Sequence, residues 1–429
     1  MTSTPTGFAA IRHPLVRDFL MARVLAIVGA QIVNVAVGWQ LYDRTGSAWS
    51  LGLIGLFELA PALIFMVPAG NVVDRFPRRT IATSAVFLTS LASLSLVVVS
   101  WFQAPVSLVY GILVVIGTAR AFSAPAISTF LPQIISRDLF VNANAWSSSA
   151  FQLSSIVGPA LGGFIIAWSG SATWAYLAAA ITQLCFVGLF LRLPQVAAAA
   201  SDGKRTFVAV FAGFAFVRRT QVFLAAITLD MFAVLLGGAV VLLPIFAKDI
   251  LHVGADGLGW LRAAPSIGSL LLMLIMTRIK PFARPGVVLL AAVAGFGLAT
   301  IAFGLSTNFL LSFVCLFFTG AFDAVSVVIR LTTEQMVTPD HLRGRVSAIN
   351  YVFIGFSNEF GAFESGSTAA LFGPVASVVG GGIGTIVVVG IVALVFRQLA
   401  QMGPLHTLKP ATVETAEEQQ DAAEVRHSP

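Results

Sequence analysis

Charged residues are scarce in this chain. Of its 429 residues, only 10% are Asp, Glu, Lys or Arg, whereas 57% are hydrophobic and the mean hydropathy is +0.92. A water-soluble globule of this length needs a polar surface, which so few charges cannot supply. The composition therefore excludes an ordinary soluble protein and predicts that the chain folds in lipid.

Signals for metal binding, catalysis and secretion are also lacking. The two cysteines, Cys185 and Cys315, lie in separate apolar runs, which excludes a disulfide framework and a metal site of paired-ligand spacing. The sequence contains no Walker loop and no nucleophile arrangement, so we expect neither an enzyme nor a bound cofactor or metal. The segment before Arg17 is polar and has no cleavage site after a short apolar core, so we expect no signal peptide.

Long apolar runs are abundant. A spanning helix needs about 20 apolar residues because the hydrocarbon core is roughly 30 Å thick. The sequence predicts an all-α membrane protein with twelve transmembrane helices in two pseudo-symmetric bundles of six. The predicted spans are 19–41, 50–69, 80–101, 106–130, 145–168, 172–191, 222–246, 257–277, 286–306, 309–330, 346–371 and 375–396.

The remaining segments divide the chain. We expect an N-terminal bundle over residues 1–194, a linker over 195–221, a C-terminal bundle over 222–400 and a disordered, acidic tail over 401–429. Within the linker, Phe207, Phe211, Phe214 and Phe216 have near-helical spacing, which predicts a helix lying on the membrane surface.

The net charge of +6 reports orientation. The basic residues fall in alternate loops rather than on one face, which argues against nucleic acid as a partner. Because cytoplasmic loops are enriched in Lys and Arg, both termini are predicted to be cytoplasmic. We expect a monomer whose partners are the lipid bilayer, a small-molecule substrate and protons. The loops on this basic side carry Arg75, Arg78, Arg79, Arg137, Lys204, Arg205, Arg218, Arg219, Arg278, Lys280, Arg284, Arg343 and Arg345, and the opposite loops only Arg44 and Lys248.

A weak internal repeat relates the halves. Gly117 matches Gly320 and Gln133 matches Gln335, at an offset of about 200 residues. Transporter folds are often built from such repeats.

The loop after the second span is rich in charge. It reads Gly70-Asn71-Val72-Val73-Asp74-Arg75-Phe76-Pro77-Arg78-Arg79, and a carboxylate among guanidiniums can form ion pairs that hold one conformation. We interpret Gly70, Asp74, Arg75, Arg78 and Arg79 as a conformational latch. The alternative is that these arginines only set topology.

This loop resembles the signature of the major facilitator superfamily, Gly-x-x-x-Asp-Arg-x-Gly-Arg-Arg, with Pro77 in place of the usual glycine. In the fifth span, Gly158-Pro159-Ala160-Leu161-Gly162-Gly163 resembles the antiporter motif of superfamily exporters, with Ser154 where a further glycine is usual. The alternative is ordinary close packing of small residues in lipid. The segments Thr338-Pro339-Asp340 and Leu342-Arg343-Gly344-Arg345-Val346 extend the likeness to the branch that contains enterobactin and drug exporters.

Ionisable residues inside spans mark a pathway, because a charge near the bilayer centre costs several kcal/mol unless it is paired or hydrated. Arg120 and Asp323 each lie about 14 residues from the outer end of their spans, and we expect them to face one cavity, where Arg120 binds an anionic group or pairs with Asp323. Asp230 is a second cavity candidate. Glu58, Glu359 and Glu364 are further candidates, because burial favours the neutral form of a carboxyl group, as proton coupling requires. For each, a structural interhelical contact is the alternative.

The resemblance implies a secondary transporter of the bacterial cytoplasmic membrane. We expect proton-coupled export of a small organic molecule, drug or siderophore-like, by alternating access. Proton-coupled uptake by the same fold is the alternative, and a membrane receptor without transport is a third possibility.

Overall fold

The chain folds entirely into helices within the residues that the structure describes. The computed structural model describes residues 9–196, 214–279, 282–339, 342–405 and 408. Tail residues beyond 408, Phe207 and Phe211 of the predicted surface helix, and loop residues Lys204, Arg205, Lys280 and Asp340 lie outside this part. The helices are α1 (Ala9–Arg12), α2 (Pro14–Thr45), α3 (Ala48–Arg75), α4 (Arg78–Trp101), α5 (Val106–Ser128), α6 (Leu131–Ile134), α7 (Arg137–Ser169), α8 (Ala172–Phe190), α10 (Gln221–Gly237), η2 (Ala239–Leu242), α11 (Leu243–Ile245), η3 (Phe246–Ile250), α12 (Gly254–Met276), α13 (Pro285–Leu305), α14 (Phe309–Val337), α15 (Arg343–Phe372), α16 (Pro374–Val395) and α17 (Arg397–Ala400).

The predicted twelve transmembrane helices are confirmed. Eleven segments of the described chain are long and apolar enough to cross a membrane. The twelfth helix, α15, is 30 residues long but more polar, since it carries Glu359 and Glu364. Large apolar side chains such as Ile64, Trp168 and Leu371 are exposed on the outside of the molecule, as a lipid-facing surface requires.

Several helices extend beyond the apolar runs. Helix α14 continues to Val337, seven residues past the predicted end of its span, and α7 begins at Arg137 rather than near 145. Polar turns continue a helix outside the hydrocarbon because water can solvate their side chains. The seventh predicted span is confirmed as Gln221–Ile250, but it is not one regular helix: α10 ends at Gly237, and a 3₁₀ turn, a short helix at Pro244 and a π-helix follow to Ile250.

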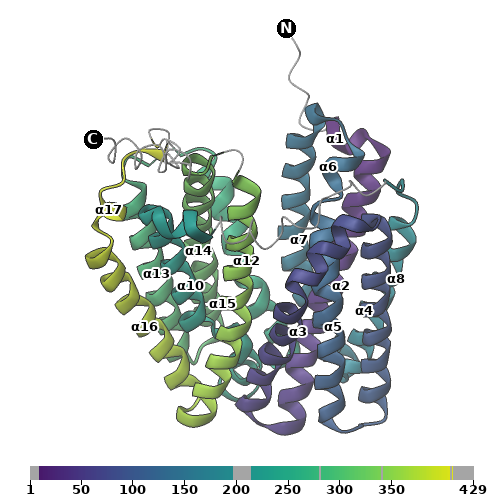
Figure 1. Cartoon of the computed structure of the whole chain (residues 1–429). Coiled ribbons are helices and arrows are strands. Elements are labelled where there is room, and N and C mark those ends of the chain that lie inside the picture. Colours follow the sequence, from purple (N-terminus) through teal and green to yellow (C-terminus); the bar gives the residue numbers. More distant parts are fainter. Residues whose placement is uncertain (1–8, 197–213, 280–281, 340–341, 406–407, 409–429) are drawn as a thin grey trace, which may run out of the picture.

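The two bundles repeat one packing pattern. In the N-terminal bundle, α2 packs on α7 and α8, α3 packs on α5, and α4 packs on α5 and α8. The C-terminal bundle has the equivalent five pairs when the six spanning helices of each half are numbered in chain order. These pairs are α10 with α15 and α16, α12 with α14, and α13 with α14 and α16. Figure 1 shows the two bundles side by side, with α1 and α17 toward the same end of the molecule.

The bundles meet along two equivalent seams of small residues. In the seam of α7 with α12, a Cβ atom added to Gly163 would lie 2.8 Å from the Cα atom of Gly259. In the seam of α3 with α15, a Cβ added to Gly52 would lie 3.0 Å from the Cα of Gly366. Gly163 and Gly366 are 203 positions apart in the sequence, so the two seams, each between one helix of either half, are related by the internal repeat. Small residues let these backbones approach closely in lipid.

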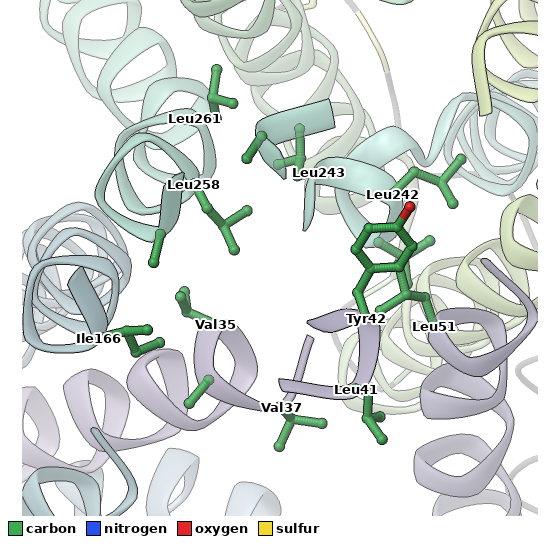
Figure 2. Packing of buried hydrophobic residues seen from close by; sticks show 14 of the residues in the cluster. Val35, Val37, Leu41, Tyr42, Leu51, Ile166, Leu242, Leu243, Leu258 and Leu261 are labelled. Atoms are coloured by element: carbon green, nitrogen blue, oxygen red, sulfur yellow. The ribbon is translucent and has the colours of Figure 1, made fainter. Parts of the chain in front are cut away.

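Apolar packing between the bundles is concentrated at one end. One cluster of buried residues joins them away from the basic loops, where Val35 and Tyr42 of α2 face Leu258 and Leu242 of the other half (Figure 2). The buried clusters nearer the basic loops each belong to one bundle: one lies around Phe19 and Phe130, and two others lie in the C-terminal half. The bundles are therefore held together at the end opposite the basic loops, called here the closed end.

Candidate functional site

Arg120 links the two bundles midway along their length. Its Nη1 atom, on α5, lies 3.1 Å from Oε2 of Glu58 on α3 and 3.3 Å from Oε1 of Glu359 on α15. Glu58 is 8% exposed. One guanidinium therefore binds a carboxylate from each half, and we call Glu58, Arg120, Glu359 and the neighbouring Arg262 the central charge cluster.

The guanidinium of Arg120 is nevertheless accessible. The Arg120 side chain is 60% exposed although the residue lies within a membrane-spanning helix, and the Glu359 side chain is 19% exposed. An exposed charge that contacts both bundles at this depth can meet a polar solute that enters between them. These geometric features make the cluster the candidate substrate site.

Arg262 is the second cation of the central cluster. It lies on α12, within range of a direct electrostatic interaction with Glu58, and its Nε atom is buried without a hydrogen-bond partner in the described residues. The sequence alone predicts that Arg262 lies near the end of its span and extends its charge to the membrane surface. Its position, 204 residues after Glu58, matches the offset of the internal repeat and could have indicated a place in the charge cluster.

A second charge cluster lies wholly inside the C-terminal bundle. Arg330 of α14 forms an ion pair with Asp230 of α10, and these residues are 5% and 6% exposed. Asp323, two turns earlier on α14, lies close enough to interact electrostatically with both. We call these three residues the C-bundle cluster.

Arg120 and Asp323 do not pair in this structure. Arg120 contacts α3 and α15, whereas Asp323 lines a small cavity between α10, α13 and α14. The two residues occupy equivalent positions, 203 apart, but Arg120 reaches across the bundle interface to Glu359, whereas Asp323 stays inside its own bundle. Of the two roles expected for Arg120, pairing with Asp323 is therefore not observed in this conformation, and the two residues belong to separate clusters. Arg330 was missed because the apolar run was predicted to end at that residue, although its spacing of seven from Asp323 puts both on one helix face.

Glu364 lies apart from both clusters. It is on α15, half-buried, and accepts a hydrogen bond from Ser365 Oγ at 3.4 Å. A further carboxylate that the sequence did not single out, Glu334 near the end of α14, is buried and accepts hydrogen bonds from Ser347 and, at 2.8 Å, from Asn350 Nδ2.

The charged loop after α3 makes no internal ion pair here. Arg78 donates to the carbonyl of Thr129 at 2.8 Å and Arg79 to that of Leu193 at 2.6 Å, so both cap the ends of neighbouring helices. Asp74 has no ion pair within 4 Å in the described part of the chain, Arg75 is exposed, and a Cβ on Gly70 would meet open space. The latch remains a prediction about another conformation.

The small residues of the fifth span form close contacts. A Cβ on Gly158 would lie 2.6 Å from Cβ of Gln31, and one on Gly162 would lie 3.2 Å from Cα of Ile32, both on α2. On the other face, Gly163 contacts α12, and a Cβ added to Gly259 would lie 2.7 Å from the backbone carbonyl oxygen of Pro159. This segment therefore packs simultaneously against its own bundle and against the other one.

Polar contacts close the end opposite the basic loops. The Tyr42 hydroxyl donates to Asp249, and Lys248 forms an ion pair with Asp43. Both contacts join α2 to η3 across the bundle interface, and we call them the clasp. Sequence patterns do not reveal such pairs, because they depend on how α2 and the broken seventh span are placed.

Comparisons with known proteins agree on a transport fold. A family model described as transmembrane secretion effector matches residues 5–423. Among curated proteins, the enterobactin exporter EntS of Shigella boydii serotype 18 is 27% identical over 389 residues, which cover 90% of this chain and 93% of that protein. EntS of Escherichia coli O139:H28 matches with the same identity and coverage.

Solved structures share the fold at low identity. A bacterial homologue of the human lysosomal transporter Spinster, in an inward-facing and unoccupied conformation, has a TM-score of 0.69 at 14% identity, covering 90% of this chain and 96% of that one. A POT family transporter in complex with 5-aminolevulinic acid has a TM-score of 0.74 at 9% identity, with coverage of 90% and 96%. The nucleoside transporter NupG has a TM-score of 0.65 at 15% identity, with coverage of 91% and 100%.

Proposed function

We propose that this chain is a proton-coupled exporter of a small organic molecule. The chain belongs to the transmembrane secretion effectors of the major facilitator superfamily. It is a membrane transporter, and its family is one of transporters rather than enzymes. The proposal adds the direction, the coupling ion and the mechanism. We place it as a monomer in the bacterial cytoplasmic membrane, with both termini inside.

The observation that carries the proposal is the position of Arg120. Its guanidinium is exposed, lies at mid-span and contacts one carboxylate from each bundle. A solute with an acidic group would compete with Glu359 for Arg120, which would release the link between the bundles. Binding would thus favour one conformation through a difference in contacts, as ligand-driven change requires.

The places where the bundles touch support alternating access as the mechanism. In the conformation described, the clasp and the shared apolar cluster hold the closed end together, while apolar clusters near the basic loops stay within single bundles. Rocking on the two glycine seams would open the closed end and bring the basic ends together. The loop with Asp74 and Arg75 would then have a partner surface to latch against.

The charge content of the central cluster limits the substrate class. Two guanidiniums and two carboxylates suit a zwitterion, or an acidic chelator of the siderophore type, better than an uncharged sugar. The EntS relatives are named for enterobactin export, which supports testing siderophores and amphiphilic drugs first.

Solute-evoked proton movement in proteoliposomes tests the proposal. Siderophores and drugs would be presented to reconstituted protein under an imposed pH gradient, with a pH-sensitive dye inside. Proton flux that requires solute, together with solute movement in the direction opposite to that of the protons, would support export. Cotransport in the same direction as protons would favour uptake instead, and binding without any flux would favour a receptor.

A further inference from the structure

Two carboxylates of the C-bundle cluster line a small, partly open cavity that the central site does not use. A cavity of about 10 Å³ lies between α10, α13 and α14, at the lower limit for one water molecule. Asp230, Asp323 and Ser326 provide its polar lining. The remaining lining residues are apolar: Ala233, Val234, Val293, Phe296 and Phe322.

The charges around this cavity do not balance. Two carboxylates, Asp230 and Asp323, face one cation, Arg330, which already binds Asp230. Helix α13 contributes only apolar side chains to the lining, and α16, which packs on α10 and α13, carries no charged residue. The charged neighbours on α12 and α15 interact elsewhere, since Arg262 and Glu359 belong to the central cluster. One negative charge therefore remains uncompensated in an apolar bundle, which is strongly unfavourable.

Ser326 shows that the cavity is built for a polar occupant. The residue is 3% exposed, it lines the cavity, and its Oγ atom has no hydrogen-bond partner in the described residues. A buried hydroxyl without a partner costs free energy, so its presence beside two carboxylates indicates that something polar binds there.

We propose that this cavity is a dedicated proton site, in which Asp230 and Asp323 bind one proton between them with Ser326 as the hydrogen-bonding neighbour, while the central charge cluster binds the solute. The inference rests on the proposed proton-coupled function and assigns the proton and the solute to different places. One added proton makes the cluster neutral, because the remaining carboxylate pairs with Arg330.

A proton fits the cavity better than a metal cation does. Sodium or a larger cation needs several oxygen ligands, and the lining supplies two carboxylates, one of them bound by Arg330, and a single hydroxyl. The small volume leaves room for at most one water to complete a coordination shell.

Buried polar residues lie on the face of α14 that leads from the cavity toward the basic end. Ser326, Arg330, Thr333 and Glu334 follow Asp323 at helical spacing, and these four residues are buried. At the basic end, Glu334 meets Ser347 and Asn350 of α15. This polar face lies inside one bundle and includes no residue of the central charge cluster.

Infrared difference spectroscopy of the full chain in lipid tests the assignment without a known solute. Lowering the pH should produce the carbonyl stretch of a protonated carboxyl group in wild type. Asp323→Asn and Asp230→Asn should each remove that band, whereas Asp256→Asn, an exposed carboxylate at the closed end of the same bundle, should leave it intact. Ser326→Ala removes no charge and should shift the band without reducing its intensity, which keeps the test valid if an Asp variant misfolds.

The outcomes separate this site from the proposed function. A band that survives in both folded Asp variants and does not move in Ser326→Ala would overturn the proton site, even if solute-evoked flux is found. A band that disappears when sodium replaces choline at constant pH would show a sodium site and would equally overturn it. If the band behaves as expected but no solute evokes flux, the proton site stands and the proposed export fails.

Discussion

At the scale of single residues, the account depends on charged side chains that lie inside the membrane-spanning helices. Arg120, Glu58 and Glu359 are recognisable in the sequence because charges inside apolar runs are costly, and the structure brings these three together. Asp323, one of the two partners expected for Arg120, lies in the other cluster. Depth along a span can be counted from the sequence, whereas the direction in which a side chain points depends on how twelve helices pack.

Replacing Arg120 should abolish coupled transport. In Arg120→Lys, the ammonium cannot offer the planar fork that reaches carboxylates on two helices, so we expect at least a tenfold loss of solute flux. Flux in proteoliposomes measures this. Arg17→Gln, which removes an exposed arginine that lies 3.9 Å from its neighbour Asp18 and far from the central charge cluster in sequence, should retain wild-type flux. Full flux in Arg120→Lys would exclude a direct role.

Removing Arg330 should destabilise the C-terminal bundle. Arg330→Met leaves Asp230 and Asp323 buried without a cation, and we expect a loss of about 3–5 kcal/mol. Adding Asp230→Leu should recover most of the loss, since replacing both partners of a buried pair by apolar residues is often neutral. Thermal unfolding of the purified variants compares them. An additive double variant would show that the two side chains do not interact.

At the scale of helices, apolar runs predicted where spans lie better than where helices end. The end of α2 at Thr45 is set by Gly46, whose φ of 59° suits glycine, and polar turns carry α14 to Val337. The break after α10 follows Gly237 and Gly238, which a hydropathy window does not detect. The sequence predicted the polar helix α15 as the span 346–371, although Glu359 and Glu364 interrupt its apolar run.

The α7 and α12 seam should be intolerant of added volume. In Gly163→Ala, the new Cβ would meet Gly259 at 2.8 Å, against backbone that cannot turn aside, and we expect about 1–3 kcal/mol of destabilisation. Gly111→Ala on α5 is the matched control, because a Cβ there meets nothing within 4 Å. Thermal unfolding in detergent checks both. Equal stability of the two variants would mean that the seam is not tightly packed in solution.

At the scale of the whole molecule, the repeat visible in a few residues became a repeat of contacts. Gly117 and Gly320 each pack on the equivalent helix of their own half, against Pro61 and Pro265 respectively. The sequence therefore predicted two related bundles. It did not predict that the apolar packing between them is concentrated at one end, because the balance between conformations depends on contacts such as the clasp that form between halves.

Weakening the clasp should favour opening of the closed end. Tyr42→Phe removes the hydrogen bond to Asp249 and Asp43→Asn removes the ion pair to Lys248, while the apolar packing of Tyr42 stays. We expect the double variant to raise the labelling rate of a cysteine introduced at Leu51, which is buried beside the clasp. Tyr110→Phe, which removes a hydroxyl contact within one bundle, should leave the rate unchanged.

The most direct test of the account is a pair of distances measured on one protein. Spin labels would be placed at Thr45 and Asp256 for the closed end, and at Ser128 and Gln335 for the basic end, with Cys185 and Cys315 replaced. Between neutral and acid pH, and between wild type and the clasp variant, alternating access predicts that one distance lengthens while the other shortens. Two distances that stay fixed, or that lengthen together, would contradict it.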